Sequence, residues 1–262
     1  MPLKSSRNSS IENALIILKS FSMDEPEMGI TEIAERCSLA KSTVHRLLTT
    51  MASEGFVYKD PNTNGYSLGV SILALTNTVN SQLPILKDSM PILNLLTERT
   101  GESSHLGILE DKDIIYLQKI ESEFPVEVLT HLGKRNPPHC TSTGQVILAY
   151  ETEQVVNEVL SGELKAFTPW TLTHADDVRK KLIEVKCLGY SVSDQEFKKG
   201  IISIGAPVFS EQGKVIASIN ITGPVERIGR QSFQKECIKE AKSAAKKLTE
   251  IITERKMRQK IR

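Results

Sequence analysis

The segment 30–55 contains two apolar patterns of helical period joined by only three residues, Ser38 to Ala40. Within each pattern the apolar residues recur every three or four positions, as on the buried face of an amphipathic helix. Gly55 follows the second pattern, where a glycine readily ends a helix. A connection this short keeps two helices in direct contact at a steep angle. The segment therefore predicts a helix-turn-helix, with apolar stripes at Ile30, Ile33, Ala34 and Cys37 and at Val44, Leu47, Leu48 and Met51.

The flanking segments extend this motif into a larger unit. A third helical pattern begins after Ser9 and Ser10, which are good N-cap residues, and the segment 24–29 is expected to be a loop. Two β-like runs, 56–58 and 65–68, enclose a turn-rich segment and predict a hairpin. Residues 1–70 thus predict a winged helix-turn-helix, whose second motif helix enters the DNA major groove. The expected buried face of the first helix consists of Ile11, Ala14, Leu15, Leu18 and Phe21.

The second helix of the motif lacks acidic residues. From Ala40 to Ser53 its only charged residues are Lys41 and Arg46, whereas a solvated helix usually mixes both signs. Its hydroxyl, imidazole and cationic groups suit base edges and phosphates. An ordinary solvated face is the alternative interpretation. The predicted DNA contacts are Thr31, Lys41, Ser42, Thr43, His45, Arg46 and Thr49 in the helices and Lys59, Asn62, Thr63 and Asn64 in the hairpin, with Thr31 and Lys59 as phosphate ligands.

Bulk composition limits the class of protein without naming a function. The 262 residues carry a formal charge of +1, so DNA binding would depend on local placement of cations. A hydrophobic content of 39% is typical of a globular chain of one or two domains. No apolar run reaches 18 residues and no signal peptide is evident, which predicts a cytoplasmic protein without a membrane partner.

The residues offer little support for catalysis or metal binding. The four cysteines are widely spaced, so reduced thiols are expected rather than disulfides or a zinc site. His139 and Cys140 are adjacent and would point to opposite faces of an extended segment. Asp194 and Glu196 could share a strand face, but no nucleophile or metal spacing accompanies them. We expect no enzyme, no cofactor and no metal; ligands drawn from distant segments stay an open possibility.

After the first unit, 71–82 predicts a linker helix, and 83–262 predicts a second domain in which strands and helices are interleaved. Its first helix ends at Gly101, and Pro91 predicts a kink or a new helix start. The whole chain is expected to be α+β. The expected strands of this domain are 103–109, 113–120, 126–132, 189–194 and a hairpin over 201–224, and the expected helices are 141–150, 153–160, 175–188 and 231 to the end.

Three segments resemble the IclR family of transcriptional regulators. They are the stretch from Gly29 to Gly69, LGKRNPPHCTSTGQVILA at 132–149, and LGYSVSDQEFKKGIISIGAPVFSEQGKVIASINITGP at 188–224. The resemblance implies a GAF-like second domain that binds a small effector, often a carboxylate, and a homodimer or homotetramer on palindromic operators. It departs at Gln145, where the family usually has Lys. Carried over position by position, the implied effector-binding residues are Ser142, Thr143, Ser193, Ser203, Asn220 and Thr222.

These six side chains are small and carry hydroxyl or amide groups. Ser142 and Thr143 stand at the predicted start of a helix, where hydrogen-bond donors and the helix dipole favour an anion. The alternative is that they only cap a helix and end strands. The chain is thus interpreted as a repressor that binds double-stranded DNA under the control of an organic acid of catabolism. The other interpretation is a winged-helix and GAF-like protein-interaction module without a small-molecule ligand.

Overall fold

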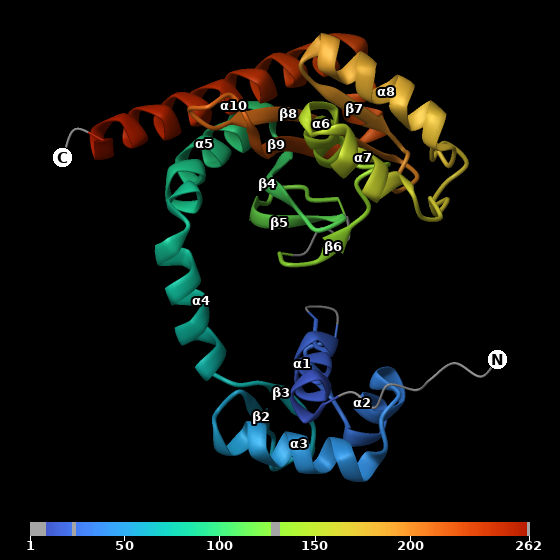
Figure 1. The fold of residues 1–262 in the computed structure, drawn as a ribbon, viewed down its shortest axis with the longest axis vertical. Helices are drawn as coiled ribbons and strands as arrows, with labels where there is room; N and C mark the ends of the chain where they lie inside the picture. The colour runs from blue at the N-terminus through green and yellow to red at the C-terminus, as the bar shows by residue number, and fades with distance from the viewer. Residues whose placement is uncertain (1–8, 23–24, 127–131, 261–262) are drawn as a thin grey trace. The chain divides into compact units, whose positions relative to one another are not determined.

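A computed structural model describes residues 9–22, 25–126 and 132–260 (Figure 1). The chain divides into two compact units, Met1–Leu83 and Pro84–Arg262. Among the described residues, no helix combines the length and the apolar character that crossing a bilayer requires.

The N-terminal unit contains the predicted winged helix-turn-helix. The described backbone forms a helix wherever 9–55 predicted one, and the hairpin strands lie within one residue of their expected positions. A capping box starts the first helix, because Ser9 Oγ accepts from the Glu12 amide while the Glu12 carboxylate accepts from the Ser9 amide. The elements are α1 (Ser10–Ser20), β1 (Glu27–Met28), α2 (Ile30–Cys37), α3 (Lys41–Ser53), β2 (Val57–Lys59), β3 (Tyr66–Leu68) and α4 (Ser71–Gln82).

The turn between α2 and α3 depends on one left-handed residue. Ser38 has φ of 53° at the C-terminal end of α2, and the Leu39 amide donates to the Ala34 carbonyl at 2.9 Å. This turn brings the predicted apolar stripes together, and Ile33, Val44 and Leu48 lie fully buried in one core. Each such side chain contributes roughly 1.5–3 kcal/mol through burial.

Two expectations for this unit were wrong. Glu27 and Met28 form a short strand paired with β3, with Met28 opposite Tyr66, where a loop was expected. In α1 the buried residues include Ile17, whereas Ile11 and Leu15 are 74% and 50% exposed. Ala14, Leu18 and Phe21 of the expected face do pack in the core, so the error is confined to Ile11 and Leu15.

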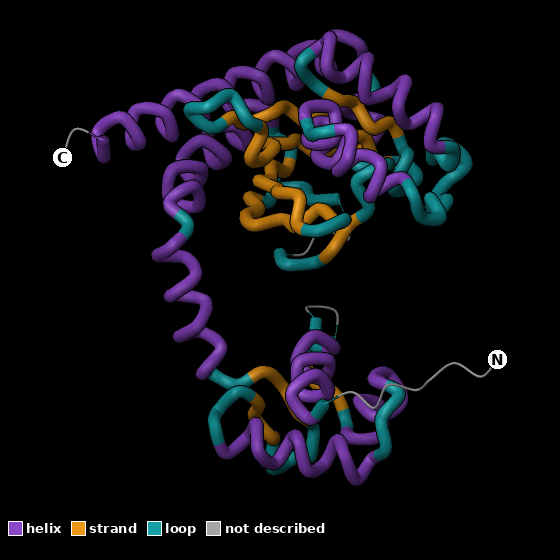
Figure 2. The backbone as a smooth tube through the Cα atoms, viewed as in Figure 1, coloured by secondary structure: helices purple, strands orange, loops and turns teal. Residues whose placement is uncertain are grey.

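The C-terminal unit is a six-stranded antiparallel sheet with helices on both faces (Figure 2). The strand order is β6-β5-β4-β9-β8-β7. Helices α5 and α10 pack on one face and α6 on the other, with α7 and α8 against α6. The elements are α5 (Pro84–Thr100), β4 (Ser103–Glu110), β5 (Asp113–Ile120), β6 (Arg135–Asn136), α6 (Ser142–Tyr150), α7 (Glu153–Leu160), α8 (Ala175–Leu188), β7 (Ser191–Asp194), β8 (Ile201–Phe209), β9 (Val215–Pro224), α9 (Val225–Ile228) and α10 (Gln231–Lys260).

Most predicted elements of this unit are present, with three differences among the described residues. The short elements β6 and α9 were not predicted. Pro91 lies inside the continuous helix α5 and does not start a new one. Most of the expected strand 126–132 falls on 127–131, outside the described residues, and Val126 and Leu132 are not in strands.

The two faces of the sheet differ in chemistry. In β8 and β9 the residues Ile202, Ile204, Ile219 and Ile221 point into the core with α5 and α10. The alternate positions face α6 and are mostly polar or glycine; most of them are also buried, and Ser203 is half-buried. Burying polar groups costs free energy unless those groups find hydrogen-bond partners. A buried polar face therefore indicates a binding site, whereas the apolar face serves packing. The strand residues of this polar face are Ser103, His105, Ser191, Ser193, Ser203, Gly205, Ser218, Asn220 and Thr222.

Candidate functional site

Helix α3 presents the predicted DNA-contacting side chains on its exposed face. Lys41, Ser42, His45 and Arg46 are exposed and Thr43 is half-buried, while Val44, Leu47 and Leu48 are buried beneath them. The buried stripe fixes the rotation of the helix, so the polar residues face outward together. No acidic residue lies in the helix, which leaves a surface of cations, hydroxyls and an imidazole suited to base edges and phosphates.

Two residues of this face already hydrogen-bond within the unit. Arg46 Nη2 of α3 lies 3.5 Å from Ser10 Oγ, so the guanidinium points toward the N-terminal end of α1. Thr49 Oγ1 donates to the His45 carbonyl at 2.9 Å, so the Thr49 hydroxyl offers a partner only its acceptor side. Thr31 is exposed in the first turn of α2.

The hairpin between β2 and β3 has an ordered tip. The Asp60 carboxylate accepts from the amides of Asn62 and Thr63, at 2.7 and 3.3 Å, and Asn64 adopts a left-handed φ of 57°. Asn62, Thr63 and Asn64 are exposed. The Thr63 hydroxyl donates to Glu27, so a carboxylate stands beside the tip. Lys59 is exposed and its Nζ lies 5.8 Å from the Tyr66 ring centroid.

On the polar face of the second unit, strand register brings distant residues into one row. Ser193 pairs with Ser203, Ser203 pairs with Thr222, and Thr222 pairs with Ser103. Directly paired residues share a face of a sheet, so these four hydroxyls line up across β7, β8, β9 and β4. Three of them were predicted as effector ligands, and Ser103 was not.

The start of α6 lies very close to this face. A Cβ added to Gly205 would stand 2.9 Å from the Ser142 carbonyl oxygen, and one added to Gly107 would stand 2.8 Å from Thr143 Cγ2. Thr141 caps the helix by accepting from the Gly144 amide at 3.3 Å. Ser142 and Thr143 are fully buried, and the Thr143 hydroxyl lies beside the Tyr116 hydroxyl, whereas the Ser142 hydroxyl has no hydrogen-bond partner among the described residues.

A small pocket opens beside the hydroxyl row. Ser193, Ser203 and Thr222 line it, whereas Ser142, Thr143 and Asn220 are buried and do not contribute to its wall. The hydroxyl of Ser193 donates to the Cys140 carbonyl at 2.8 Å, so only its acceptor side is left for a ligand. Further residues, which were not predicted from the sequence, complete the wall. They are Tyr116, Thr141, Phe197, Lys198 and Ile201.

Some of the missed residues had a signal in the sequence. Phe197 and Lys198 directly follow the Asp-x-Glu segment, and Lys198 is a cation within a stretch that was matched to the family. Tyr116 carried none, because it alternates with apolar residues along β5 as any core residue would.

A neutral polar cluster lies deeper on the same face. His105 Nδ1 and Asn220 Oδ1 are 2.9 Å apart, and the His105 and Tyr116 ring centroids are 5.1 Å apart. Complete burial lowers the pKa of His105 to about 3, with the charge of Lys119 acting in the same direction. Burial also raises the pKa of Tyr116, an effect opposed by the neighbouring Thr143 hydroxyl and the Asn220 amide. Both rings are therefore uncharged at neutral pH.

The structure separates the residue pairs considered for catalysis. Burial raises the pKa of the Cys140 thiol far above its ordinary value, and His139 instead lies 3.1 Å from the Lys165 carbonyl. Asp194 and Glu196, which could have shared a strand face, do not. The left-handed Gln195 turns the chain between them, so that Asp194 is exposed and Glu196 is buried. All four cysteines are free thiols.

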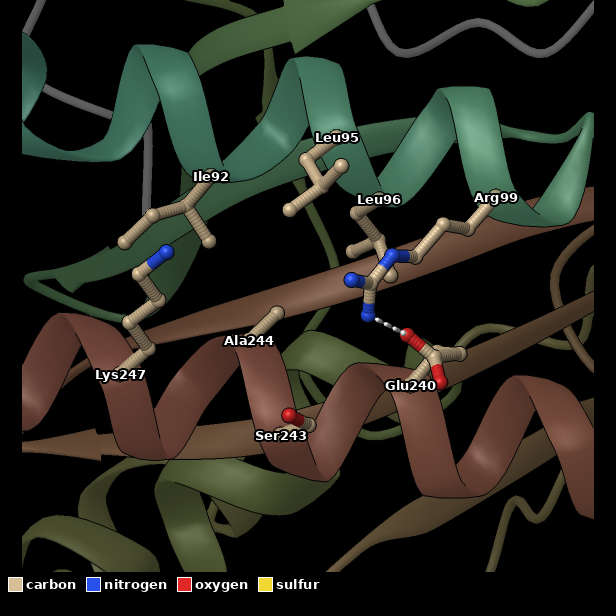
Figure 3. Close-up of a pocket in the computed structure, with 8 residues that line it drawn as sticks. All are labelled: Ile92, Leu95, Leu96, Arg99, Glu240, Ser243, Ala244 and Lys247. Carbon is tan, nitrogen blue, oxygen red and sulfur yellow. Dashed lines mark hydrogen bonds and ion pairs between the residues drawn. The ribbon is translucent and has the colours of Figure 1, made fainter.

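A separate surface groove lies between α5 and α10 (Figure 3). Leu95 and Ala244 are among its lining residues, and the Arg99 guanidinium reaches across to Glu240 at 3.0 Å. Because α5 and α10 cover the apolar face of the sheet, this groove lies on the side away from the hydroxyl row. The ion pair ties the two helices together at their surface.

Comparisons with known proteins agree with this architecture. Residues 10–61 match the IclR helix-turn-helix domain, and residues 77–250 match the family model described as bacterial transcriptional regulator IclR C-terminal. The HTH-type transcriptional regulator XynR of Escherichia coli is 31% identical over 220 residues, which cover 84% of this chain and 87% of that protein.

Two solved structures are also similar. The IclR transcriptional regulator of Alicyclobacillus acidocaldarius is 28% identical with a TM-score of 0.82, covering 93% of this chain and 98% of that one. An IclR homolog of Microbacterium hydrocarbonoxydans, solved with 4-hydroxybenzoate, shares the fold at 23% identity with a TM-score of 0.83, covering 93% of this chain and 99% of that one. The chain, with its winged helix and its helix-covered sheet, belongs to the IclR family of bacterial transcriptional regulators.

Proposed function

We propose that this regulator is a repressor whose affinity for its operator is controlled by a small organic acid. In this proposal α3 enters the major groove, where Ser42, Thr43 and Arg46 meet base edges and Lys41 meets a phosphate. The exposed, acid-free face of α3 over a fully buried apolar stripe supports this role. Thr31, His45, Thr49, Lys59, Asn62 and Asn64 are proposed as additional DNA contacts.

The second domain is proposed to bind the carboxylate of the effector in the pocket beside the hydroxyl row. The observation that carries this proposal is the polar face itself, where Ser203 and Thr222 pair at the pocket wall and the buried start of α6 at Ser142 lies against Gly205 of the same strand β8. Neutral donors bind a carboxylate without leaving an unpaired buried charge when the site is empty. Half-buried Lys198 adds a positive charge at the pocket wall. Asn220 and Ser193 would orient the site.

The proposed regulator is a cytoplasmic homodimer or homotetramer, and its symmetry matches a palindromic DNA site. In this proposal, effector binding changes the spacing of the DNA-binding domains and hence the affinity for the operator. Residues 71–82, which form α4, would be the linker that transmits this change. The domain assignment proposed is 1–70 for DNA and 83–262 for effector and assembly.

The test combines ligand screening with DNA binding. Thermal unfolding of the purified chain is followed against small carboxylates, 4-hydroxybenzoate included, and against sugars. A ligand at one hundred times its Kd adds about 2.7 kcal/mol of stability. Thr222→Val and Ser203→Ala should abolish the stabilisation, whereas Ser243→Ala, on the exposed side of α10, should keep it. A sugar hit, or a hit that survives both pocket variants, would contradict the proposal.

The same hit is then added to the protein bound to a DNA site selected from a random library. Loss of DNA binding in its presence supports an effector that relieves repression. A chain that enriches no DNA sequence, with or without the ligand, would favour a protein-interaction module instead.

A further inference from the structure

Glu196 is a buried carboxylate at the edge of the proposed effector pocket. It precedes Phe197 and Lys198, two residues of the pocket wall, and its exposed fraction is 8%. The left-handed turn at Gln195, with φ of 58°, directs it inward from the end of β7. The pocket as described makes no use of this carboxylate.

The side-chain partner of Glu196 is the amide of Gln145. Gln145 Nε2 donates to Glu196 Oε2 at 2.6 Å and to the His139 carbonyl at 3.0 Å, and Gln145 Oε1 accepts from Ser191 Oγ at 2.5 Å. Gln145 is itself fully buried. One side chain of α6 thus connects the segment before that helix, the strand β7 and the 195–200 loop. We call the Ser191, Gln145 and Glu196 side chains the 145–196 brace.

No described residue forms an ion pair with Glu196, so its charge has no direct compensation. Burial raises the pKa of Glu196 to about 7, the Gln145 hydrogen bond opposes this rise, and Lys181 of α8 also lowers it while Asp194 of β7 raises it. The other titratable groups nearby are Lys198, in the same loop, and two groups before α6: the Cys140 thiol, kept protonated by burial, and His139, whose pKa burial lowers. The partner of Glu196 is the neutral amide of Gln145, whereas a cation at that position would favour the ionised carboxylate.

The geometry points to Glu196 and Gln145 as positioning residues whose brace changes when Glu196 gains or loses its proton and thereby adjusts the 195–200 loop against the start of α6. When Glu196 is protonated, the brace contains no buried charge and its hydrogen bonds can all be made by neutral groups. When Glu196 is ionised, a buried anion relies on one amide and on Lys181 at longer range, which favours opening of the loop toward water.

A consequence for regulation rests on the proposed function of the pocket. The negative charge of a carboxylate effector would disfavour the ionised form of Glu196, so binding would take up a proton. Affinity for such an effector would then weaken as the pH rises above neutrality, by up to about tenfold per pH unit when one proton is fully coupled. A neutral effector would show no such dependence.

The deciding experiment needs no effector. The full chain with ¹³C-labelled glutamate carboxyl groups is titrated from pH 3.5 to 8.5 by NMR, and the amides of Thr143, Phe197 and Lys198 are followed in parallel. We expect one carboxyl resonance and these three amides to share a midpoint near neutral pH. Glu196→Gln should remove both the resonance and the shared transition. Glu211→Gln, in the exposed β8–β9 turn, should leave them unchanged.

A second variant tests the cause. Gln145→Lys supplies the missing cation and should move the midpoint to lower pH by about 1 to 3 units. A Glu196 resonance that titrates at the ordinary glutamate value of 4.5 overturns the proposal. A transition of the pocket amides that persists in Glu196→Gln also overturns the proposal. This test does not depend on whether Gln145→Lys folds.

Coupling to ligand is measured separately, by calorimetric titration with 4-hydroxybenzoate and with acetate as probes in buffers of different ionisation enthalpy. Proton uptake that disappears in Glu196→Gln supports the coupling, and binding without proton uptake contradicts it. Absence of binding by either probe counts against the proposed effector class, while the ligand-free titration still decides the brace.

Discussion

Gly205 in β8 lies directly beneath Ser142 at the start of α6, and a Cβ on the glycine would stand 2.9 Å from the Ser142 carbonyl oxygen. Only a residue without a side chain permits this approach. The contact holds the buried residues Ser142 and Thr143 against the polar face of the sheet.

Gly205→Ala should therefore displace the first turn of α6. The neighbouring atom is backbone, so it cannot rotate away as a side chain would, and we expect a loss of about 1 to 3 kcal/mol in the free energy of unfolding. Urea unfolding measures this loss. Gly162→Ala is the matched control, because a Cβ there meets nothing within 4 Å. Equal stability of the two variants would show that α6 does not depend on the close approach.

Arg46→Ala should weaken binding to the selected DNA site by about 1 to 3 kcal/mol if the guanidinium reads a base edge. Binding to unrelated sequences should then change little. Fluorescence anisotropy at several salt concentrations measures both. A uniform loss on all sequences with a shallower salt slope would instead make Arg46 a phosphate ligand. Lys19→Ala, in the last turn of α1, serves as the control of equal charge change.

Arg227→Met should destabilise the second unit, because it leaves Glu102 as a buried carboxylate without its partner. The guanidinium meets Glu102 through two hydrogen bonds, at 2.6 and 2.7 Å, and Glu102 is 1% exposed. Because the Arg227 side chain is 40% exposed, we expect about 2 to 3 kcal/mol, below the range for a deeply buried pair. The double variant Arg227→Met with Glu102→Gln should recover part of the loss in chemical unfolding. No recovery would assign the effect to packing.

His105 should make the protein sensitive to acid. Its pKa is about 3 when folded and 6.5 when unfolded, so between these values the unfolded chain binds the extra proton. Stability attributable to His105 is present above pH 6.5 and falls as the pH decreases, by up to about 1.4 kcal/mol per unit. His105→Gln should flatten the pH dependence of the unfolding midpoint between pH 6.5 and 4.5. The raised pKa of Glu196 makes its contribution to stability increase as the pH falls, opposite to that of His105. The unfolding midpoints of His105→Gln and the wild type are therefore compared at each pH.

The helices and hairpins of this chain could be predicted closely from the sequence, because caps, turns and apolar periods are local signals. The capping box at Ser9, the short connection between α2 and α3 and the turn between β8 and β9 each specify their structure within a few residues. The family was also evident, since three motifs occur in order. The two-residue strand at Glu27 was missed, because its pairing with Tyr66 and Ser67 involves residues about 40 positions away.

For the site, local sequence could name polar residues but could not say what each one does. Ser193 looked like a donor to a ligand, yet its hydroxyl donates to the Cys140 carbonyl. Asp194 and Glu196 looked like a pair, yet one left-handed residue turns them to different surroundings. Tyr116 and Ser103 had no distinguishing signal, because each becomes part of the polar face only through its neighbours in the sheet.

The amino-acid sequence by itself determined the order of elements, the winged helix with its acid-free helix α3, and the presence of small polar residues in β7, β8 and β9, because all of these follow from short-range patterns. Only the tertiary structure decided that Ser193, Ser203, Thr222 and Ser103 form one row and that Gln145 meets Glu196. Strand register and burial depend on contacts between residues far apart in the chain. Those contacts set which hydroxyl lacks a partner and which carboxylate lacks a cation.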